Sequence, residues 1–342
     1  MRRVIVRVPP YRPIQMDGQR MVLAGRDTTG SLVWARDWRR EASESMTNDS
    51  SFFAPTVREL RWRHGRTHDE YAEHGVAELE DREKGRPAVI LGCGPSLVKA
   101  LPYVKELREK HGHFVIASNM ALTAGFDQCC DYYVLLCWLS QPWWWKRAKR
   151  DGIKCVCSFQ TPPEIIRDWP ERYYFCDTFV DVTMDRPESR KRYGSLDGGG
   201  TVIYSALHLA WKLGASRIVY AGMDYAWTDF QDHPGDPMRY EKGMRREPQV
   251  VKDIHGNATV TDKTLLSLCD LMRMQTYLVQ DAGIPCVNIT DAGIFDIGGN
   301  MPPEEYMAAV RAGDQFVQDR PFKQFDKEEV KDGCHDKEPV QC

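Results

Sequence analysis

The chain has 342 residues, of which 42% are hydrophobic and 28% charged, as is typical of a soluble globular protein with one large or two ordinary domains. Its 46 basic and 49 acidic residues give a net charge of −3, so the composition does not support nucleic acid or an anionic membrane as a partner. No apolar run reaches the roughly 20 residues that span a bilayer, and the start, MRRVIVRVPPYRP, lacks the apolar stretch of a signal peptide. We therefore expect a cytoplasmic protein without a membrane span.

The first part of the chain, residues 1–86, differs from the remainder in composition and in the pattern of its apolar residues. It contains charged, tryptophan-containing stretches such as WARDWRREASE and shows little alternation, which indicates a partly helical N-terminal extension of unknown role. His64, His68 and His74 lie in this part at spacings of four and six residues. Such spacings are compatible with a metal site, but a solvated helix is the more common reason for them.

From Pro87 onward, short apolar runs alternate with helical stretches. The runs predicted as strands are AVILGCG, HFVIASN, YYVLLCW, IKCVCSF, TFVDVTM, SRIVYAGMD and IPCVNIT. This alternation predicts an α/β fold for residues 87–313, a Rossmann-like, mostly parallel sheet with helices on both faces. Residues 314–342, which end in KQFDKEEVKDGCHDKEPVQC, have the composition of a disordered tail.

Two helices are predicted from their apolar periodicity. The run TVIYSALHLAWKLG places apolar side chains on one helical face and stops at Gly214, and His208 within it is expected to pack. The run TDKTLLSLCDLMRMQTYLVQDAG predicts the second helix, with Thr261 as its N-cap and Gly283 as its stop.

The eleven cysteines are expected to be reduced core residues, because most lie in predicted strands or on helix faces. The sequence contains no CxxC pair, so it gives little support for zinc, and we predict no metal site.

The segment Ala88–Leu97, AVILGCGPSL, predicts a buried strand that leads into a glycine turn and a helix start. Gly92 and Gly94 allow a sharp turn and a close approach to a ligand, and the fixed φ of Pro95 suits a first helical turn that continues through Ser96. A helix N-terminus offers free N–H donors and a partial positive charge, which favour a phosphate. An ordinary strand-to-helix turn is the alternative.

Polar residues follow other predicted strands and are expected at the same edge of the sheet. Asn119 follows HFVIAS, and Asp224 follows RIVYAGM, where it either accepts hydroxyls of a ribose or sugar or caps the next turn. A second glycine-rich helix start, which includes Gly199, Gly200 and Thr201, suits an anionic group.

Asp229–Val250 is polar, rich in proline and basic residues, and longer than an ordinary connection, which is typical of a lid. Arg239, Arg245 and Arg246 are its candidates for closing on phosphate, although a charge run is usually only solvated. His255 follows this loop and precedes a predicted helix. An imidazole is suited to remove a proton from an attacking hydroxyl, so His255 is the candidate catalytic base, with an ordinary surface histidine as the alternative.

The run Trp143–Trp145 either stacks on a sugar or base or anchors a helix against the sheet or a partner subunit. The packing role is favoured, and a homo-oligomer is compatible with it.

The order GCGPSL, SNMA, DGGGTVIYSALHLAWKLGASRIVYAGMDYAW and HGNATVTDKTLLSL, over about Pro87–Gly298, resembles the superfamily called domain of unknown function 115. That superfamily joins archaeal 6-hydroxymethylpterin diphosphokinases with motility accessory factors, which are regarded as flagellin glycosyltransferases. The chain also resembles the sialyltransferases of glycosyltransferase family 42. In those enzymes the glycine turn and a following asparagine contact the CMP moiety. The resemblance therefore implies nucleotide contacts from the matching residues, Gly92, Gly94, Pro95, Ser96 and Asn119, with His255 as base and no metal.

The diphosphokinases share the strand end Gly222–Asp224 but resemble a Mg²⁺ and ATP enzyme with an Asp-x-Asp-Gly motif after a middle strand. Here the matching stretch, YVLLCWLS, has no carboxylate after Asp131. Because Mg²⁺ bound with a polyphosphate normally needs a carboxylate, this departure disfavours kinase chemistry.

We therefore expect a glycosyltransferase-like enzyme that transfers a sugar from a nucleotide-activated donor, of the CMP-sugar type, to a hydroxyl acceptor that the sequence does not identify. The first alternative is an ATP- and Mg²⁺-dependent diphosphotransferase, the only hypothesis that needs a metal cofactor. The second alternative is a nucleotide-binding module without catalysis.

Overall fold

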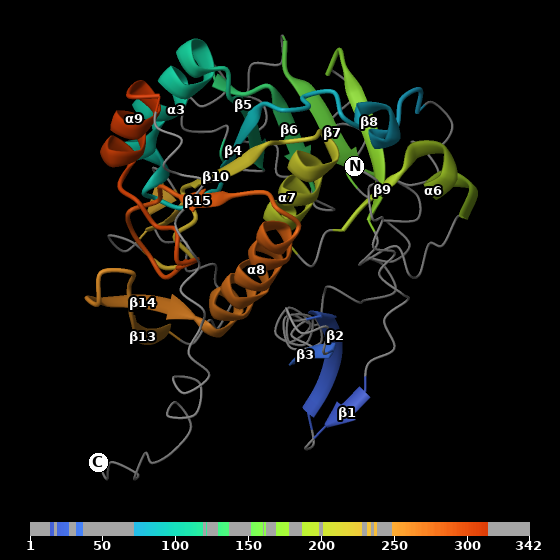
Figure 1. Ribbon diagram of the computed structural model, residues 1–342. Coiled ribbons are helices and arrows are strands. Elements are labelled where there is room, and N and C mark those ends of the chain that lie inside the picture. Colours follow the sequence, from blue (N-terminus) through green and yellow to red (C-terminus); the bar gives the residue numbers. More distant parts are fainter. Residues whose placement is uncertain are drawn as a thin grey trace.

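The computed structural model describes residues 14–16, 19–26, 32–36, 72–118, 121, 129–136, 152–159, 161, 169–177, 187–197, 201–227, 231–233, 236–237 and 248–313 (Figure 1). Its central element is an eight-stranded sheet with the strand order β15-β10-β4-β5-β6-β7-β8-β9, in which every pairing is parallel. The strands are β4 (Pro87–Leu91), β5 (Phe114–Ser118), β6 (Tyr132–Leu135), β7 (Lys154–Ser158), β8 (Arg172–Asp177), β9 (Ser195–Leu196), β10 (Arg217–Ala221) and β15 (Cys286–Asn288). The predicted Rossmann-like α/β fold is confirmed.

The strand order reverses its direction of growth at β4. The chain runs from β4 through β5 to β9 on one side and then returns to place β10 on the other side of β4. The connections that leave β4 and β10 therefore diverge at the carboxyl ends of these strands. This topological switch point is where open α/β sheets bind ligands.

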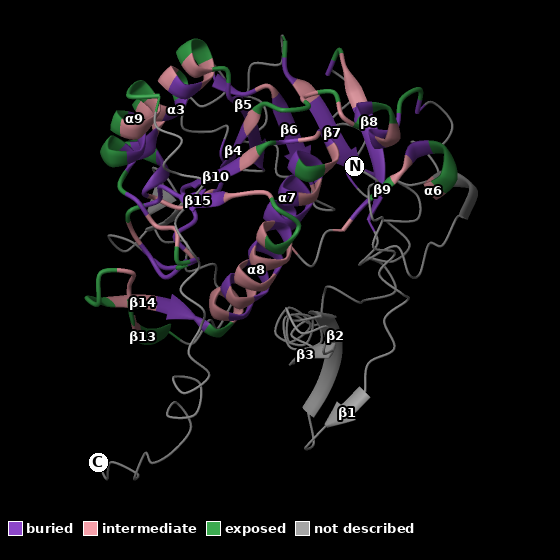
Figure 2. Ribbon diagram, in the orientation of Figure 1, coloured by how far each residue is buried: buried purple, intermediate pink, exposed green. Residues whose placement is uncertain are grey.

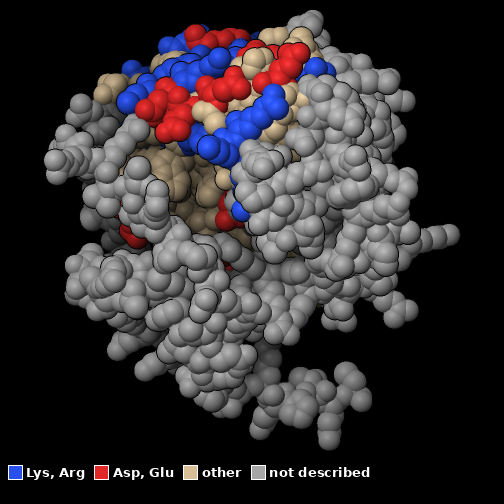
Figure 3. All heavy atoms as spheres, turned by 90° about the vertical axis from the view of Figure 1, so that its right-hand side faces the viewer, with Lys and Arg blue, Asp and Glu red and all other residues tan. Residues whose placement is uncertain are grey.

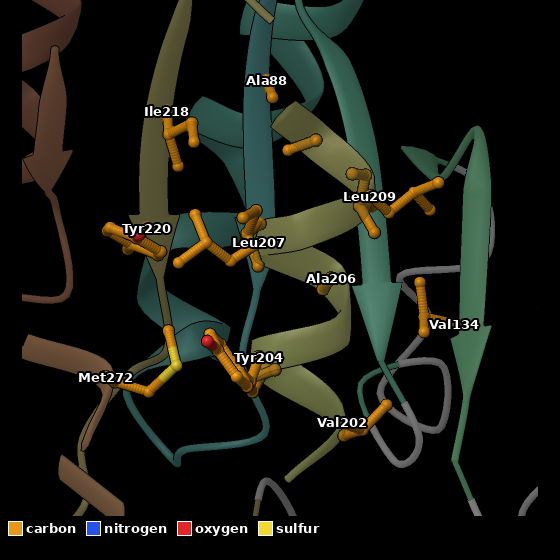
Figure 4. Close-up of a cluster of buried hydrophobic side chains, with 14 of the residues drawn as sticks. Ala88, Val134, Val202, Tyr204, Ala206, Leu207, Leu209, Ile218, Tyr220 and Met272 are labelled. Carbon is orange, nitrogen blue, oxygen red and sulfur yellow. The ribbon is translucent and has the colours of Figure 1, made fainter. Parts of the chain in front are cut away.

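Helices cover both faces of the sheet because successive strand residues point to opposite sides. Val89 and Leu91 of β4 pack in one core with α3 (Leu97–His111) and α9 (Pro303–Arg311). Ala88 and Ile90 pack in the other core, with α7 (Val202–Lys212) and α8 (Lys263–Asp281), which Figure 4 shows in close-up. Burial follows this layering, with the strands almost wholly enclosed (Figure 2).

The two predicted helices are confirmed with one shifted boundary. Thr201 is the N-cap of α7, and Gly214 after it has φ +83°. The N-cap of α8 is Asp262, whose Oδ1 accepts a hydrogen bond from Leu265 N at 2.9 Å. Thr261 was the wrong prediction for this cap, because its hydroxyl instead donates to the carbonyl of Tyr225 at 2.7 Å.

Two sheet regions were not predicted. β8, with the sequence RYYFCD, comes directly before the predicted strand TFVDVTM, which lies outside the described residues. In the N-terminal extension, where helix was expected, β1 (Ile14–Met16), β2 (Gln19–Arg26) and β3 (Leu32–Arg36) form an antiparallel sheet. The dipeptide Asp17–Gly18 is the sequence signal for such a hairpin.

Residues 72–86, which the sequence analysis assigned to the extension, contribute to the cores of the sheet domain. The 3₁₀ helix η1 (Val76–Leu79) places Val76 and Leu79 in one core with full burial, and Gly75 pairs with Tyr174 of β8. The folded region therefore begins before Pro87. At the other end, the predicted tail, residues 314–342, lies outside the described residues.

The remaining described elements are α6 (Pro187–Tyr193) and two antiparallel pairs: β11 (Gln231–His233) with β12 (Asp236–Pro237), and β13 (Pro248–Lys252) with β14 (Ala258–Asp262). The predicted lid loop thus contains β11, β12 and the first residues of β13, and its remaining residues lie outside the described part of the chain. None of the helices within the described ranges is long and apolar enough to cross a bilayer.

Charged side chains on one face of the described surface are intermixed rather than segregated by sign (Figure 3). On the side that carries β8 and α6, basic and acidic residues alternate (Figure 3). Arg82 pairs with Glu171 at 3.5 Å, and Lys84 pairs with Asp81 at 3.1 Å. The described part of this face therefore presents no broad basic patch of the kind that nucleic acid requires.

The cysteines that the structure describes are free thiols, and all but Cys93 are buried. Burial raises the pKa of Cys269 and of Cys286 to about 12. These two thiols are accordingly inert core groups, as expected.

A buried histidine makes the stability of the fold depend on pH. His113 is 3% exposed, with Nδ1 3.1 Å from the carbonyl oxygen of His111 and Nε2 3.3 Å from the Tyr306 hydroxyl. Burial lowers the pKa of His113 to about 4, against the opposing effect of the hydrogen bond to His111. Because the unfolded chain takes up this proton near pH 6.5, the folded state loses stability as the pH falls from about 6.5 to about 4, by roughly 3 kcal/mol in all.

Urea unfolding of the native chain and of His113→Gln between pH 7 and pH 4 measures this contribution, because all other titrating groups are shared. The variant is expected to lose less stability over this range. Equal losses in the two proteins would contradict the assignment.

Candidate functional site

The loops after β4 and β10 interlock at the topological switch point. The backbone N–H of Gly92 donates to the carbonyl of Ala221, and that of Gly94 donates to the carbonyl of Gly222, each at 2.8 Å. The close approach predicted for this glycine turn is therefore made to the backbone after β10.

Asp224 fills the space in front of this turn. Its carboxylate, on a residue that is 1% exposed, accepts hydrogen bonds from the Ser96 backbone N at 3.1 Å and from the Ser96 hydroxyl. A Cβ atom at Gly94 would lie 2.2 Å from Asp224 Oδ1, so only glycine leaves room for the carboxylate.

Asp224 therefore caps the start of α3, which lies 128 residues earlier in the chain and is not the next turn that the sequence analysis named. The backbone N–H of Leu97 also bonds within the protein, to the Gly94 carbonyl at 3.1 Å. A carboxylate thus already occupies the position that the sequence analysis gave to a phosphate. The phosphate role of Gly92, Gly94, Pro95 and Ser96 stays a prediction.

The start of α7 lies at the same edge of the sheet, on the opposite face. Figure 4 shows Val202, the first residue of α7, at the end of the sheet away from Ala88, which lies near the start of β4. Thr201 has an extended backbone and its side chain makes no capping hydrogen bond to the helix. The first N–H groups of α7 are therefore not capped by the Thr201 side chain. Backbone N–H groups at a helix start favour an anion as their partner.

Several predicted site residues lie outside the described part of the chain. They are Asn119, Gly199, Gly200, Arg239, Arg245, Arg246 and the tryptophans Trp143, Trp144 and Trp145.

His255 lies in the turn of the β13–β14 hairpin, not directly before a helix as the sequence suggested, because β14 separates it from α8. Asp253 Oδ1 shapes this turn by accepting from the backbone N of His255 at 2.9 Å and from that of Asn257 at 2.8 Å.

The hairpin contacts the segments that follow β15 and β10. The Ile254 N–H donates to the Gly293 carbonyl at 2.9 Å, and the Trp227 N–H donates to the Val260 carbonyl at 2.7 Å. These contacts bring His255 to the carboxyl edge of the sheet.

Asp291, which the sequence analysis did not single out, is the partner of His255. Nε2 of His255 lies 3.2 Å from Asp291 Oδ1 and 3.4 Å from the Asp291 carbonyl oxygen. The signal that would have found it is a carboxylate directly after the predicted strand IPCVNIT, at the same edge as Asp224.

The segment that carries Asp291 also contacts Asp224. The Ile294 N–H donates to the Asp224 carbonyl at 2.8 Å, and a Cβ at Gly293 would lie 2.0 Å from that carbonyl oxygen. One connected set of contacts thus runs from Ser96 at the start of α3, through Asp224, to the segment that holds His255.

Asp131 does not supply a magnesium ligand at this edge. It precedes β6, at the amino end of the strand, and its carboxylate accepts from Arg108 Nη2 at 2.8 Å and from the Val115 N–H at 2.9 Å. Among the residues that the structure describes, no group of three or more His, Cys, Asp or Glu side chains is placed to hold a metal ion.

Two other histidines have structural surroundings. His208 packs against Tyr204, with ring centroids 4.9 Å apart, which agrees with its predicted packing role. His74 is exposed and pairs with Glu78 at 2.9 Å, whereas His64 and His68 lie outside the described residues.

Comparison with known proteins finds a family model and solved structures that are similar to this chain. Residues 64–230 match a family model described as 6-hydroxymethylpterin diphosphokinase MptE-like. A similar solved structure is the MAf glycosyltransferase from Magnetospirillum magneticum AMB-1, with 16% sequence identity and a TM-score of 0.47, over 72% of this chain and 42% of that chain. This chain thus spans less than half the length of that structure. No curated protein matches the sequence. The family match confirms the predicted resemblance to the 6-hydroxymethylpterin diphosphokinases, whereas the resemblance to the sialyltransferases of glycosyltransferase family 42 stays a prediction.

Proposed function

We propose, from the match of residues 64–230 to the MptE-like family, that the protein is a transferase acting on a nucleotide-activated donor at the switch point between β10 and β4. We favour a glycosyltransferase-like reaction with a CMP-sugar donor and a hydroxyl acceptor. The observation that carries the proposal is the convergence of the Asp224–Ser96 contact and the His255–Asp291 pair at this edge.

The donor's phosphate is assigned to the start of α7, with Gly199, Gly200 and Thr201, because Asp224 already caps the start of α3. The turn formed by Gly92, Gly94 and Pro95 then serves as a rigid wall of the site. The resemblance assigns Asn119 to the nucleotide. The basic composition of the lid makes Arg239, Arg245 and Arg246 the candidates for closing on the phosphate.

His255 acts as the general base in this reaction. Its imidazole takes the proton of the acceptor hydroxyl while the acceptor oxygen bonds to the anomeric carbon. The bond between that carbon and the phosphate oxygen of the donor breaks, and the nucleotide leaves as an anion. The partial positive charge at the α7 start supports this departure without a metal ion.

The second candidate is ATP- and Mg²⁺-dependent diphosphate transfer, favoured by the description of the matching family. The diphosphokinases that the sequence resembles carry an Asp-x-Asp-Gly motif after a middle strand, and Mg²⁺ bound with a polyphosphate normally needs such a carboxylate. The stretch after β6 offers none in its sequence, and Asp131 is engaged with Arg108 at the other end of the strand. This candidate therefore ranks below the first.

Thermal unfolding with CMP, UDP, GDP and ADP compounds, each with and without Mg²⁺, distinguishes these reactions. A ligand at a hundred times its Kd stabilises the folded state by about 2.7 kcal/mol. We expect a cytidine nucleotide to raise the Tm without Mg²⁺. A rise with ATP only in the presence of Mg²⁺ would favour diphosphate transfer, and no rise with any nucleotide would contradict both.

A further inference from the structure

The contacts of His255 Nε2 fix which ring nitrogen carries the proton in the neutral imidazole. Its two neighbours, Asp291 Oδ1 at 3.2 Å and the Asp291 carbonyl oxygen at 3.4 Å, belong to groups that only accept hydrogen bonds. Nε2 must therefore be the protonated nitrogen. The lone pair of the neutral ring then resides on Nδ1.

Nδ1 is available to a substrate. No residue in the described part of the chain forms a hydrogen bond with it, and the His255 side chain is 48% exposed. Among the described groups, none binds the basic atom Nδ1, whereas the other ring nitrogen, Nε2, contacts Asp291.

The backbone holds Asp291 in an unusual conformation for this contact. Its φ is 53°, in the left-handed region that a non-glycine residue seldom adopts, and such backbone strain clusters at functional sites. Asp291 lies between the strand end of β15 and Gly293, whose carbonyl fastens the His255 hairpin. An exposed ion pair contributes little to stability, so stability does not account for this arrangement.

We propose that Asp291 is the positioning residue of His255: it selects the tautomer with the lone pair on Nδ1 and stabilises the imidazolium that forms when Nδ1 takes the acceptor proton. The step rests on the proposed transfer reaction. The proton moves from the acceptor hydroxyl to Nδ1, the Nε2 proton stays on the ring, and Asp291 remains a carboxylate throughout. Asp291 thus acts through His255 and contacts no reacting atom.

The tautomer is testable without any knowledge of the substrate. In ¹⁵N spectra of the histidine-labelled protein above pH 8, we expect His255 to show a protonated Nε2. In Asp291→Asn the amide N–H₂ can donate to Nε2 instead, so we expect the signal to shift toward the Nδ1-protonated tautomer, and in Asp291→Glu to return toward the native one. Glu78→Gln removes the partner of an equally exposed histidine, His74, and should leave the His255 signal unchanged.

The kinetic readout uses the nucleotide-sugar identified by thermal unfolding. Asp291→Asn should lower kcat on the order of 10- to 100-fold with little change in KM, because only the proton transfer is affected. A His255 signal with protonated Nδ1 in the native protein, or one that Asp291→Asn does not move, would overturn the role of Asp291. The expected tautomer shift without transfer activity in any variant would instead contradict the proposed function and leave the control of the ring by Asp291 in place.

Discussion

Replacing Gly293 with alanine is expected to lower the free energy of unfolding by about 2 to 4 kcal/mol, whereas Gly298→Ala should cost only about 1 kcal/mol. Both glycines have left-handed backbones, with φ of +74° and +70°. They differ in their surroundings, because a Cβ at Gly293 would lie 2.0 Å from the Asp224 carbonyl oxygen and one at Gly298 would meet nothing within 4 Å. The difference between the two variants therefore isolates the contact between the segments that follow β10 and β15.

Urea unfolding of both variants measures this difference. Displacement of Gly293 would also disturb the hydrogen bond from Ile254 N that fastens the His255 hairpin, so Gly293→Ala should reduce transfer activity more than Gly298→Ala does. Equal losses of stability in the two variants would show that Gly293 and Asp224 are not packed as described.

Substitution of His255 by glutamine is expected to lower the turnover of the nucleotide-sugar by 10²- to 10⁴-fold, the usual contribution of a general base. The folded state should keep its stability, since the side chain is about half exposed and its pair with Asp291 adds little. Release of the free nucleotide from the donor, with the acceptor present, is the measurement.

His74→Gln is the matched control for this variant. His74 and Glu78 form a pair with 51% and 50% exposed side chains, close to the 48% and 43% of His255 and Asp291. This pair lies at η1, with His74 before it and Glu78 within it. We expect His74→Gln to retain full turnover. Native turnover in His255→Gln would contradict the catalytic assignment, and nucleotide binding with no turnover in the native chain would favour the non-catalytic module.

The elements predicted correctly are those specified by local signals. The extent of α7 follows from its apolar periodicity, from Thr201 at its start and from Gly214 at its end. The position of β8 does not follow from a local signal, because strands buried on both faces of a parallel sheet lack alternation. Two adjacent runs rich in aromatic and β-branched residues, RYYFCD and TFVDVTM, are equally typical of such a strand. Only packing against the neighbouring strands decides between them.

The candidate site was predictable in its location but not in its internal contacts. The sheet topology brings the strand ends to one edge, so the neighbourhood of Ser96 and Asp224 follows from the predicted parallel strands. That Asp224 takes the anion position at the start of α3 depends on a contact over 128 residues, and that Asp291 meets His255 depends on one over 36. No local pattern encodes contacts of this range.

The most direct test of donor binding at the switch point is amide hydrogen exchange of the native chain, with and without the nucleotide that raises the Tm most. We predict slower exchange at residues 201–204 at the start of α7, at residues 222–227 after β10 and at residues 253–257 around His255. Slower exchange confined to the opposite end of the sheet, such as residues 72–86 and 111–114, would contradict the proposed site.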